Sequence, residues 1–530
     1  MTDAFDRRSF LKGAAMLSAL TALGVPASAL AEDSGLSFGE AKPFSFDALT
    51  ERAKTLASQA FVPPVKPSPE ITAQLNYEAL GKIKYKTDDA LWADGSKPFP
   101  VTFFHLGNYF QKRVAINLIE GANAREIVYR KSLFDMPADS PAQAMPDGVG
   151  FAGFRFQEPH AGSLDWKKND WVAFLGASYF RAIGELFQYG LSARGIAINS
   201  ANPNPPHDEE FPDFTEFWIE AVEGSSNQVK VYALLDGPSV SGAYAFLFQR
   251  GKAVLTDVES HIFTRNDVAR FGLAPLTSMY WFSETVKQTA IDWRPEIHDS
   301  DGLAIWSGNG EHIWRPLNNP PATVVSSFAD SNPKGFGLLQ RDRSFDHYLD
   351  GVRYEIRPST WIEPLDAFGE GAVQLIEIPT DDEIHDNIVV MWVPKDPVKA
   401  GQSFRLKYRI HWAADEPSPS PLGRCVATRM GNGGQPGTVR PKGVRKFMIE
   451  FLGGPLKDVP FGVMPEAVLT SSRGEFSYIF TEAVPDGVPG HWRAQFDLTV
   501  TGPEPAELRC YLKQGEQVLT ETWLYQYHPF

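Results

Sequence analysis

Cysteine is nearly absent from this chain: Cys425 and Cys510 are the only two among 530 residues. No Cys-x-x-Cys and no His-Glu-x-x-His motif occurs, which argues against a structural zinc site. The Walker and Rossmann glycine patterns that hold nucleotides are missing as well. We therefore expect no cofactor. Whether the two thiols form a disulfide or stay reduced in a core is left open.

Basic residues are scarce relative to acidic ones, with 50 Lys and Arg against 65 Asp and Glu and a net charge of −15. Nucleic-acid-binding proteins need basic patches, so we expect no nucleic-acid partner. The same acidity argues against binding to anionic membrane surfaces. No apolar run after residue 31 approaches the roughly 20 residues that span a bilayer, so we expect no membrane span in the mature chain.

Residues 1–31 have the features of an export signal. A twin arginine, Arg7-Arg8, precedes a weakly hydrophobic stretch over 14–30, and an Ala-x-Ala cleavage pattern occupies 29–31. A basic start, a short apolar region and a small-residue cleavage site are typical of a signal peptide that is removed after export. The sequence therefore predicts a twin-arginine (Tat) signal peptide and a mature protein outside the cytoplasm.

Glycine, proline and aromatic residues are abundant, with 44 Gly, 41 Pro, 37 Phe, 16 Tyr and 13 Trp. Short β-branched and aromatic runs such as "QVKVYALLD" (228–236) and "AYAFLFQ" (243–249) are bounded by turn residues. Such runs, without alternating helices, predict an all-β fold of antiparallel sheets packed face to face. The stretch 45–60 is the exception, because its apolar spacing near 3.6 and its Ser/Asp start predict a short helix.

The chain is too long for one simple core, so we expect two domains. The segment "VPKDPVKAG" (393–401) places two prolines and a glycine between two strand-like runs, which indicates a boundary. We predict a large β-sandwich over 32–393, a linker over 394–402 and a second sandwich over 403–530. The last range has the size and strand number of an immunoglobulin-like domain.

Two acid-rich loops stand among aromatic residues, "HDSDG" (298–302) and "PTDDEIHDN" (379–387). The first resembles a calcium loop, but Gly302 comes too early and the twelfth residue is Gly310 instead of glutamate. We therefore expect no metal there. Paired carboxylates suit glycoside hydrolysis, in which one acid protonates the leaving oxygen and the other activates water. Acidic residues that merely cap turns are the competing interpretation.

Seven blocks of the sequence, in order, resemble the family of periplasmic glucan biosynthesis proteins G and D. The blocks are "FLGASYFRA" (174–182), "YGLSARGIAI" (189–198), "EEFPDFTEFW" (209–218), "HDSDGL" (298–303), "RPLNNP" (315–320), "NPKGFGLLQRDR" (332–343) and "ETWLYQY" (521–527). The resemblance covers nearly the whole chain. It implies a periplasmic protein with a galactose mutarotase-like β-sandwich (a supersandwich) and a C-terminal Ig-like sandwich.

The resemblance also implies a function. Family members control the structure of the β-1,2-linked glucose backbone of osmoregulated periplasmic glucans, and some D-type members are similar to inverting endo-β-1,2-glucanases. Carried over to this sequence, Asp386 would be the acid and Asp299 the base, supported by Glu383 and Tyr354. The residues that we expect to bind substrate are Trp361, Tyr348, Trp306, Asp301 and Arg357.

Two functions therefore stay open on the sequence. The first is a β-1,2-glucan hydrolase, and the second is a non-catalytic protein that holds glucan for an inner-membrane glucan synthase. In either case we expect the protein to bind β-1,2-glucan. A sugar epimerase would rest on likeness of fold alone, which does not carry function.

Overall fold

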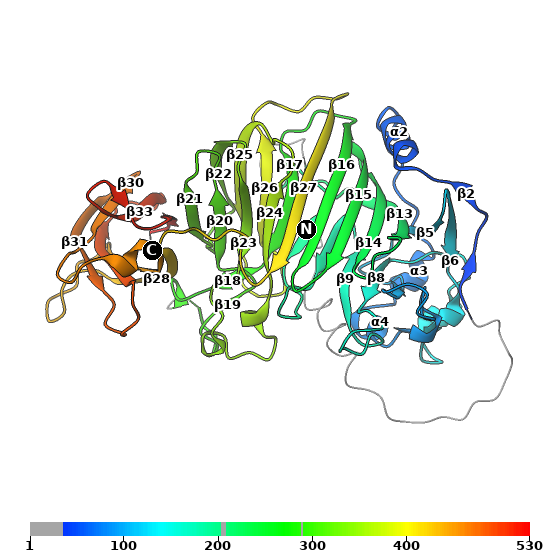
Figure 1. Cartoon of the computed structure of the whole chain (residues 1–530), viewed down its shortest axis with the longest axis horizontal. Coiled ribbons are helices and arrows are strands. Elements are labelled where there is room, and N and C mark those ends of the chain that lie inside the picture. Colours follow the sequence, from blue (N-terminus) through cyan, green and yellow to red (C-terminus); the bar gives the residue numbers. More distant parts are fainter. Residues whose placement is uncertain (1–34, 203–207, 288–289, 530) are drawn as a thin grey trace. The chain divides into compact units, whose positions relative to one another are not determined.

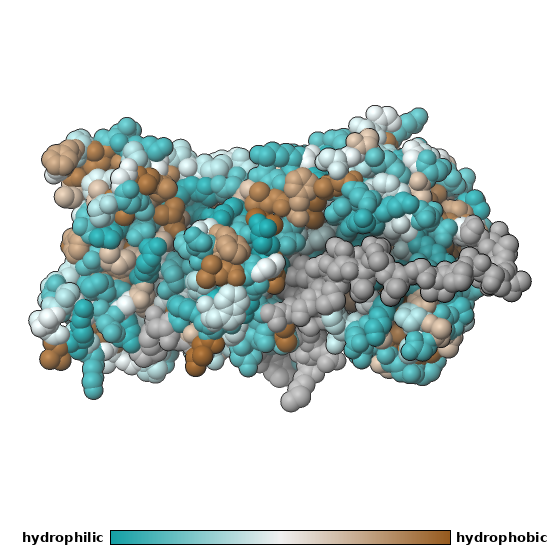
Figure 2. Space-filling model, turned by 90° about the horizontal axis from the view of Figure 1, so that it is seen from below, coloured by the Kyte–Doolittle hydropathy of each residue, from teal (hydrophilic) through white to brown (hydrophobic). Residues whose placement is uncertain are grey.

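The computed structural model describes residues 35–202, 208–287 and 290–529 (Figure 1). Strands make up 46% of it and helices 9%, which confirms the all-β prediction. No helix among the described residues is long and apolar enough to cross a membrane. The predicted signal peptide, residues 1–31, lies outside the described residues. Hydrophilic residues predominate on the face shown in Figure 2, and hydrophobic ones form small separate groups there.

The chain forms two compact units. The first comprises Met1–Thr277, Ile384–Asp386 and Met391–Trp412, and the second comprises Ser278–Glu383, Asn387–Val390 and Ala413–Phe530.

The segment after the predicted linker belongs to the first unit. Strand β27 (Ser403–Ala413) pairs with β16 (Val254–Thr264) along almost its whole length, from Ser403 opposite Phe263 to Trp412 opposite Val254. The proline-containing segment 394–402 is thus a connection after which the chain returns to the same unit. The Ig-like assignment of the strands that follow stays a prediction.

One sheet of the first unit joins β27 and β16 to five further strands, seen side by side in Figure 1. They are β5 (Ala115–Glu120), β6 (Asn123–Val128), β13 (Asp213–Ala221), β14 (Gln228–Asp236) and β15 (Val240–Arg250). Neighbours from β13 to β27 pair antiparallel, whereas β5 runs parallel to β13. In β16, "VLTDVESHIFT", residues alternate strictly between buried and half-buried, as a strand with one face on a core must.

A second sheet of the first unit contains shorter strands. In order they are β4 (Val101–Phe104), β8 (Gly153–Gln157), β9 (Asp170–Leu175), β10 (Tyr179–Ala182), β11 (Ser192–Arg194) and β17 (Phe271–Ser278). The two sheets pack through phenylalanine rings. The ring of Phe174 on β9 lies 5.5 Å from that of Phe246 on β15, and Phe154 on β8 lies 5.1 Å from Phe217 on β13. This confirms a sandwich in the first unit.

The predicted helix at 45–60 is confirmed as α2 (Phe46–Ala57). Ser45 caps it, because its hydroxyl accepts a hydrogen bond from the Ala48 amide at 3.2 Å. Leu49 and Ala53 form its buried face. The remaining short elements are α3 (Pro69–Thr72), α4 (Tyr77–Gly81), β1 (Ser37–Phe38), β2 (Lys42–Pro43), β3 (Lys84–Tyr85), β7 (Phe134–Asp135) and β12 (Ala197–Ile198).

The second unit begins with strands that carry the acidic loop at 298–302. Strand β18 (Tyr280–Phe282) pairs with β19 (Ile297–His298). Four further strands pair in the order β21 (His312–Pro316), β20 (Gly302–Trp306), β23 (Gly335–Leu339) and β24 (Ser359–Pro364). Strand β22 (Val324–Ser331) pairs antiparallel with β25 (Glu370–Glu377), and β26 (Ile388–Pro394) follows in the chain.

The C-terminal strands of the second unit form two groups. The first is the sheet β28 (Arg424–Asn432), β29 (Val444–Leu452), β32 (His491–Thr499) and β31 (Glu475–Ala483). The second contains β30 (Glu466–Ser471), β33 (Ala506–Gln514), β34 (Gln517–Val518) and β35 (Thr522–Tyr527), and β35 runs parallel to β21. Cys425 and Cys510 are both buried there as free thiols.

Candidate active site

Asp299 lies directly after β19 in the second unit and is only 1% exposed. Its amide donates to the Met279 carbonyl at 2.9 Å, which fixes the backbone where the strand ends. The Nε atom of Arg357 lies 3.0 Å from its Oδ1 atom. A buried guanidinium at this distance favours the ionised form of the carboxylate. Asp299 and Arg357, both predicted from the sequence, are therefore brought together.

Arg357 connects Asp299 to a second predicted pair. Its guanidinium carbon lies 4.8 Å from the ring centre of Tyr354, a cation–π geometry. The Tyr354 hydroxyl donates a short hydrogen bond to Oε2 of Glu383. Tyr354 and Glu383 are each 3% exposed. Three of the four predicted catalytic residues thus lie in one buried chain of contacts within the second unit.

Arg294 closes this chain and was not predicted. Its Nη1 atom donates to Glu383 at 2.8 Å and to Asp350 at 2.5 Å, and its other nitrogens bind both oxygens of Asp292. Burial by itself would lower the pKa of Arg294, but the hydrogen bonds to Asp292 and Asp350 raise it above its usual value. Arg294 is therefore a permanent cation that holds Glu383 beside Tyr354.

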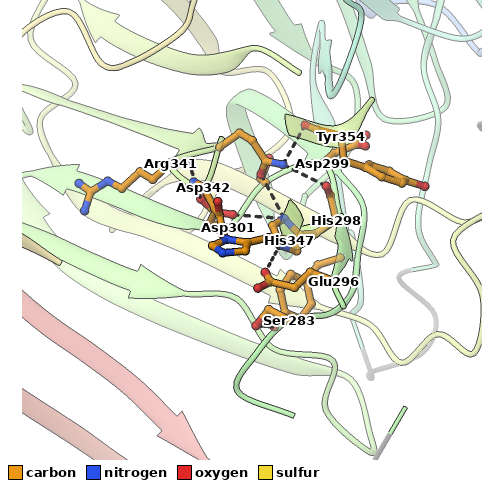
Figure 3. A network of polar contacts seen from close by, with 12 residues as sticks. Ser283, Glu296, His298, Asp299, Asp301, Arg341, Asp342, His347 and Tyr354 are labelled. Atoms are coloured by element: carbon orange, nitrogen blue, oxygen red, sulfur yellow. Dashed lines mark hydrogen bonds and ion pairs between the residues drawn. The ribbon is translucent and has the colours of Figure 1, made fainter. Parts of the chain in front are cut away.

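His298 sits between carboxylates next to Asp299 (Figure 3). Its Nε2 atom lies 3.0 Å from Glu296, and its Nδ1 atom lies 3.2 Å from Asp301 and 3.1 Å from Gln340. Burial lowers the pKa of His298, but the hydrogen bond to Glu296 and the charge of Asp301 outweigh it and raise the pKa to about 9. His298 is thus a cation at neutral pH.

Asp301, predicted as a substrate ligand, is occupied by protein groups. Its Oδ2 atom accepts hydrogen bonds from the backbone amides of Arg341 and Asp342. Burial raises the pKa of Asp301 to about 6, although the nearby His298 opposes the shift. These contacts tie the end of β23 to the acidic loop.

Gln340 is the residue that joins these parts, and the sequence analysis did not single it out. Its side-chain nitrogen donates to the carbonyls of His298 and Tyr354 and to the Tyr348 hydroxyl, at 3.0–3.2 Å. Gln340 is fully buried. It lies within the block "NPKGFGLLQRDR", but no residue spacing marks a glutamine as a junction. Only the contacts of the folded chain reveal it.

The three aromatic residues predicted as sugar platforms lie in the second unit in different surroundings. Tyr348 is 0% and Trp361 3% exposed. Trp361 packs over Gly335, where a side-chain carbon would come within 2.4 Å of the indole. Trp306 is half-buried, with His312 stacked at 5.1 Å and Lys334 4.9 Å from the ring centre. Tyr348 and Trp361 thus pack within the protein, and a platform role for the three stays a prediction.

Asp386, the predicted acid, belongs to the first unit. Its charge acts there on Tyr179. Burial raises the pKa of Tyr179, Arg194 lowers it, and Asp386 raises it further. Arg194 lies over the Tyr179 ring at 5.1 Å and is itself 2% exposed. The pairing of Asp386 with Asp299 stays a prediction.

A groove of about 910 Å³ in the first unit was not predicted. Tyr109 and Phe211 in its lining are 44% and 38% exposed, so both rings are partly open to solvent. The side chains of Asn108, Gln111 and His385 add hydrogen-bonding groups to the same lining. Rings with one open face beside amides are the surface that a sugar polymer needs, and ligand sites are generally concave.

Comparison with known proteins identifies the family. Residues 44–527 match the model of the family described as "Periplasmic glucan biosynthesis protein, MdoG". The chain belongs to this family. The resemblance noted in the sequence is thereby confirmed.

Relatives match over nearly the full chain. The chain is 62% identical over 528 residues to glucans biosynthesis protein D 2 of Ralstonia nicotianae, covering 99% of this chain and 98% of that protein. It is 44% identical over 544 residues to glucans biosynthesis protein D of Xanthomonas oryzae pv. oryzae, with the same shares covered. A solved GH36 alpha-galactosidase, AgaA from Geobacillus stearothermophilus, matches with a TM-score of 0.23 and 11% identity over 45% of this chain and 40% of that one, too slight to bear on function.

Proposed function

We propose that the protein hydrolyses the β-1,2-linked glucose backbone of periplasmic glucans with inversion, and so sets the structure of that backbone. Its family and its named relatives support the broader role in periplasmic glucan biosynthesis. The resemblance of "HDSD" and "IHDNI" to the loops of inverting enzymes supports hydrolysis. We also propose that the protein lies in the periplasm and is exported through the Tat route. The twin arginine at Arg7-Arg8 supports this part of the proposal.

The observation that carries the proposal is the buried contact between Asp299 and Arg357. A general base must be ionised before it can accept a proton from water. The cation 3.0 Å away favours that state, and burial keeps the pair from competing solvent.

Tyr354 and Glu383 supply a path for the proton. The Tyr354 ring lies under Arg357, which contacts Asp299, while the Tyr354 hydroxyl donates to Glu383, so a proton that reaches this hydroxyl can pass to Glu383. Inversion requires space for a water between acid and base, typically about 6.5–9.5 Å. In the proposed reaction Asp386 protonates the leaving oxygen and Asp299 receives the proton of the attacking water, directly or through Tyr354.

The groove of the first unit is the proposed binding surface for the glucan. Tyr109 and Phe211 offer ring faces to the apolar faces of glucose, and Asn108 and Gln111 offer hydrogen bonds to its hydroxyls. The same groove would serve the second candidate, a protein that binds glucan without cutting it and presents it to an inner-membrane synthase. Chemistry at Asp386 therefore has to be tested apart from binding.

The test is incubation of the purified protein with linear β-1,2-glucan, followed by assay of new reducing ends. We expect reducing ends with the wild type, none with Asp386→Asn, and unchanged binding of the polymer by that variant. Asp381→Asn is the matched control, because Asp381 lies in the same loop but is exposed. Binding without new reducing ends in the wild type would replace hydrolysis with the assembly role.

A further inference from the structure

Three side chains that commonly bind metals meet in the second unit beside the proposed catalytic network. Glu296, Asp342 and His347 each offer one ligand atom, and these atoms lie within 4.8 Å of one another. Glu296 precedes β19, Asp342 follows β23, and His347 ends the 3-10 helix η5 (Phe345–His347). The fold gathers them from three segments (Figure 3).

Glu296 has an oxygen without a partner among the described residues. Its Oε2 atom lies 3.0 Å from Nε2 of His298, but no described residue donates a hydrogen bond to its other oxygen. Glu296 is only 6% exposed. One oxygen of this largely buried carboxylate thus stays available to a further positively charged partner.

A cavity of about 40 Å³ adjoins the cluster, and its walls carry an excess of acid. Glu284, Glu296, Asp301 and Asp342 all line it, with His298 as the only histidine. The guanidinium of Arg341, which also lines the cavity, is engaged by Glu521 and Glu416, from which its nitrogens lie 2.6 and 3.3 Å. One water needs about 10–15 Å³, so the cavity has room for an ion together with a water.

We propose that Glu296, Asp342 and His347 bind one divalent transition-metal cation. Two carboxylates with one imidazole suit Zn²⁺ or Mn²⁺, whereas Ca²⁺ and Mg²⁺ prefer oxygen ligands alone. Nδ1 of His347 and Oδ2 of Asp342 lie 2.5 Å apart, so on binding they separate, the proton of that contact is released to solvent, and each atom contacts the cation instead. The His347 side chain is 49% exposed, so the cation enters from solvent, and water fills the coordination positions that the protein leaves open.

The cation would fasten η5 to β19. Tyr348, the next residue after η5, donates to the Asp342 carbonyl at 3.0 Å, and the chain then runs on to Tyr354. A cation at His347 thus steadies the segment that carries Tyr354, whatever reaction that segment serves. Motifs of closely spaced ligands could not predict this site, because Glu296 and His347 lie about 50 residues apart in the sequence.

The test is calorimetric titration of EDTA-treated, purified protein with ZnCl₂ and MnCl₂, together with thermal unfolding. We expect one equivalent to bind the wild type and to raise its Tm, because a ligand that prefers the folded state stabilises it. His347→Ala, at a half-exposed position, should keep its fold by circular dichroism, lose the rise in Tm and bind at least about tenfold more weakly. Asp346→Asn, exposed in the same 3-10 helix, should behave as the wild type.

Asp342→Asn gives a second, independent readout if His347→Ala is poorly folded, and we expect the same loss of affinity. The proposal is overturned if the wild type binds neither cation. It is also overturned if a folded His347→Ala or Asp342→Asn variant binds with wild-type stoichiometry and affinity, since other histidines would then hold the cation.

Discussion

The groove of the first unit and the buried network of the second unit present their polar and aromatic groups in opposite ways. The first unit keeps rings such as Tyr109 and Phe211 open to a wide groove, at 44% and 38% exposure. The network of the second unit instead buries its charges, with Asp299 and Arg357 both 1% exposed. An open surface binds a polymer through many weak contacts, whereas buried charges fix the protonation state of single atoms. Binding and chemistry should therefore be separable by substitution.

The largest effect is expected at Asp299. Asp299→Asn removes the proposed base while keeping the shape of the side chain, so activity should fall by about 10²–10⁴-fold. Glucan binding should stay near the wild-type value. Initial rates of reducing-end formation and the Kd for the polymer test the two parts, and a variant that loses both equally would contradict the separation.

Arg294 should show the greatest effect on stability. Arg294→Met leaves Asp292, Asp350 and Glu383 without their shared cation, so the free energy of unfolding should fall by about 3–5 kcal/mol. Lys399→Met breaks an exposed ion pair in the first unit, with Asp267 at 2.8 Å, and should cost less than about 1 kcal/mol. Denaturant unfolding measures both variants. Equal losses in the free energy of unfolding would show that burial of the ion pair does not determine the size of the effect.

The acidic cavity should make stability depend on pH. Burial, reinforced by the charge of Glu296, raises the pKa of Glu284 from 4.5 to about 8. The folded protein holds this proton more tightly than the unfolded chain does. The proton therefore stabilises the fold fully below about pH 4.5, and this stabilisation is lost as the pH rises to about 8. The free energy of unfolding should fall by at most about 1.4 kcal/mol per pH unit over that range. With EDTA present, Glu284→Gln should therefore gain stability relative to the wild type between pH 5 and pH 8. A difference independent of pH would contradict the shift.

Tyr354 should have a smaller effect, on the rate. Tyr354→Phe keeps the ring under Arg357 but removes the hydroxyl that bonds Glu383, and hydrogen bonds to charged groups contribute about 1.5–3 kcal/mol. We expect kcat to fall by about 10- to 100-fold with little change in KM. A change confined to KM would place Tyr354 in binding instead.

The smallest effect belongs to the groove. Tyr109→Ala removes one open ring, and KM for the polymer should rise by about two- to tenfold with kcat unchanged. Phe187→Ala is the control, because Phe187 is 60% exposed in the same unit but does not line the groove. An equal change in both variants would show that the groove is not the binding surface.

Local patterns predicted the strands and the helix well. The alternation in 254–264 and the capped start of 45–60 are properties of neighbouring residues, and the structure confirms both. The segment 403–412 differs, because the sequence marks a boundary before it but cannot say which strand it will pair with. Pairing with β16 requires a partner about 150 residues away, and only tertiary packing selects it.

The site was predicted in part, by resemblance more than by residue chemistry. Asp299, Tyr354, Glu383 and Arg357 were named in advance and lie in one network. Gln340 and Arg294 were missed, because their roles consist of contacts with segments distant in sequence. The structure shows that Tyr348 and Trp361 are buried, whereas the rings of the groove are partly exposed. The number of aromatic residues in the sequence could not distinguish these two kinds of ring.

The most direct test of the account is the anomeric form of the first product released from linear β-1,2-glucan, followed by ¹H NMR before mutarotation. Inversion at a β-linkage gives the α-anomer, and the account predicts that this form appears first with the wild type and is absent with Asp299→Asn. First appearance of the β-anomer, or no product from a protein that binds the polymer, would contradict inverting hydrolysis.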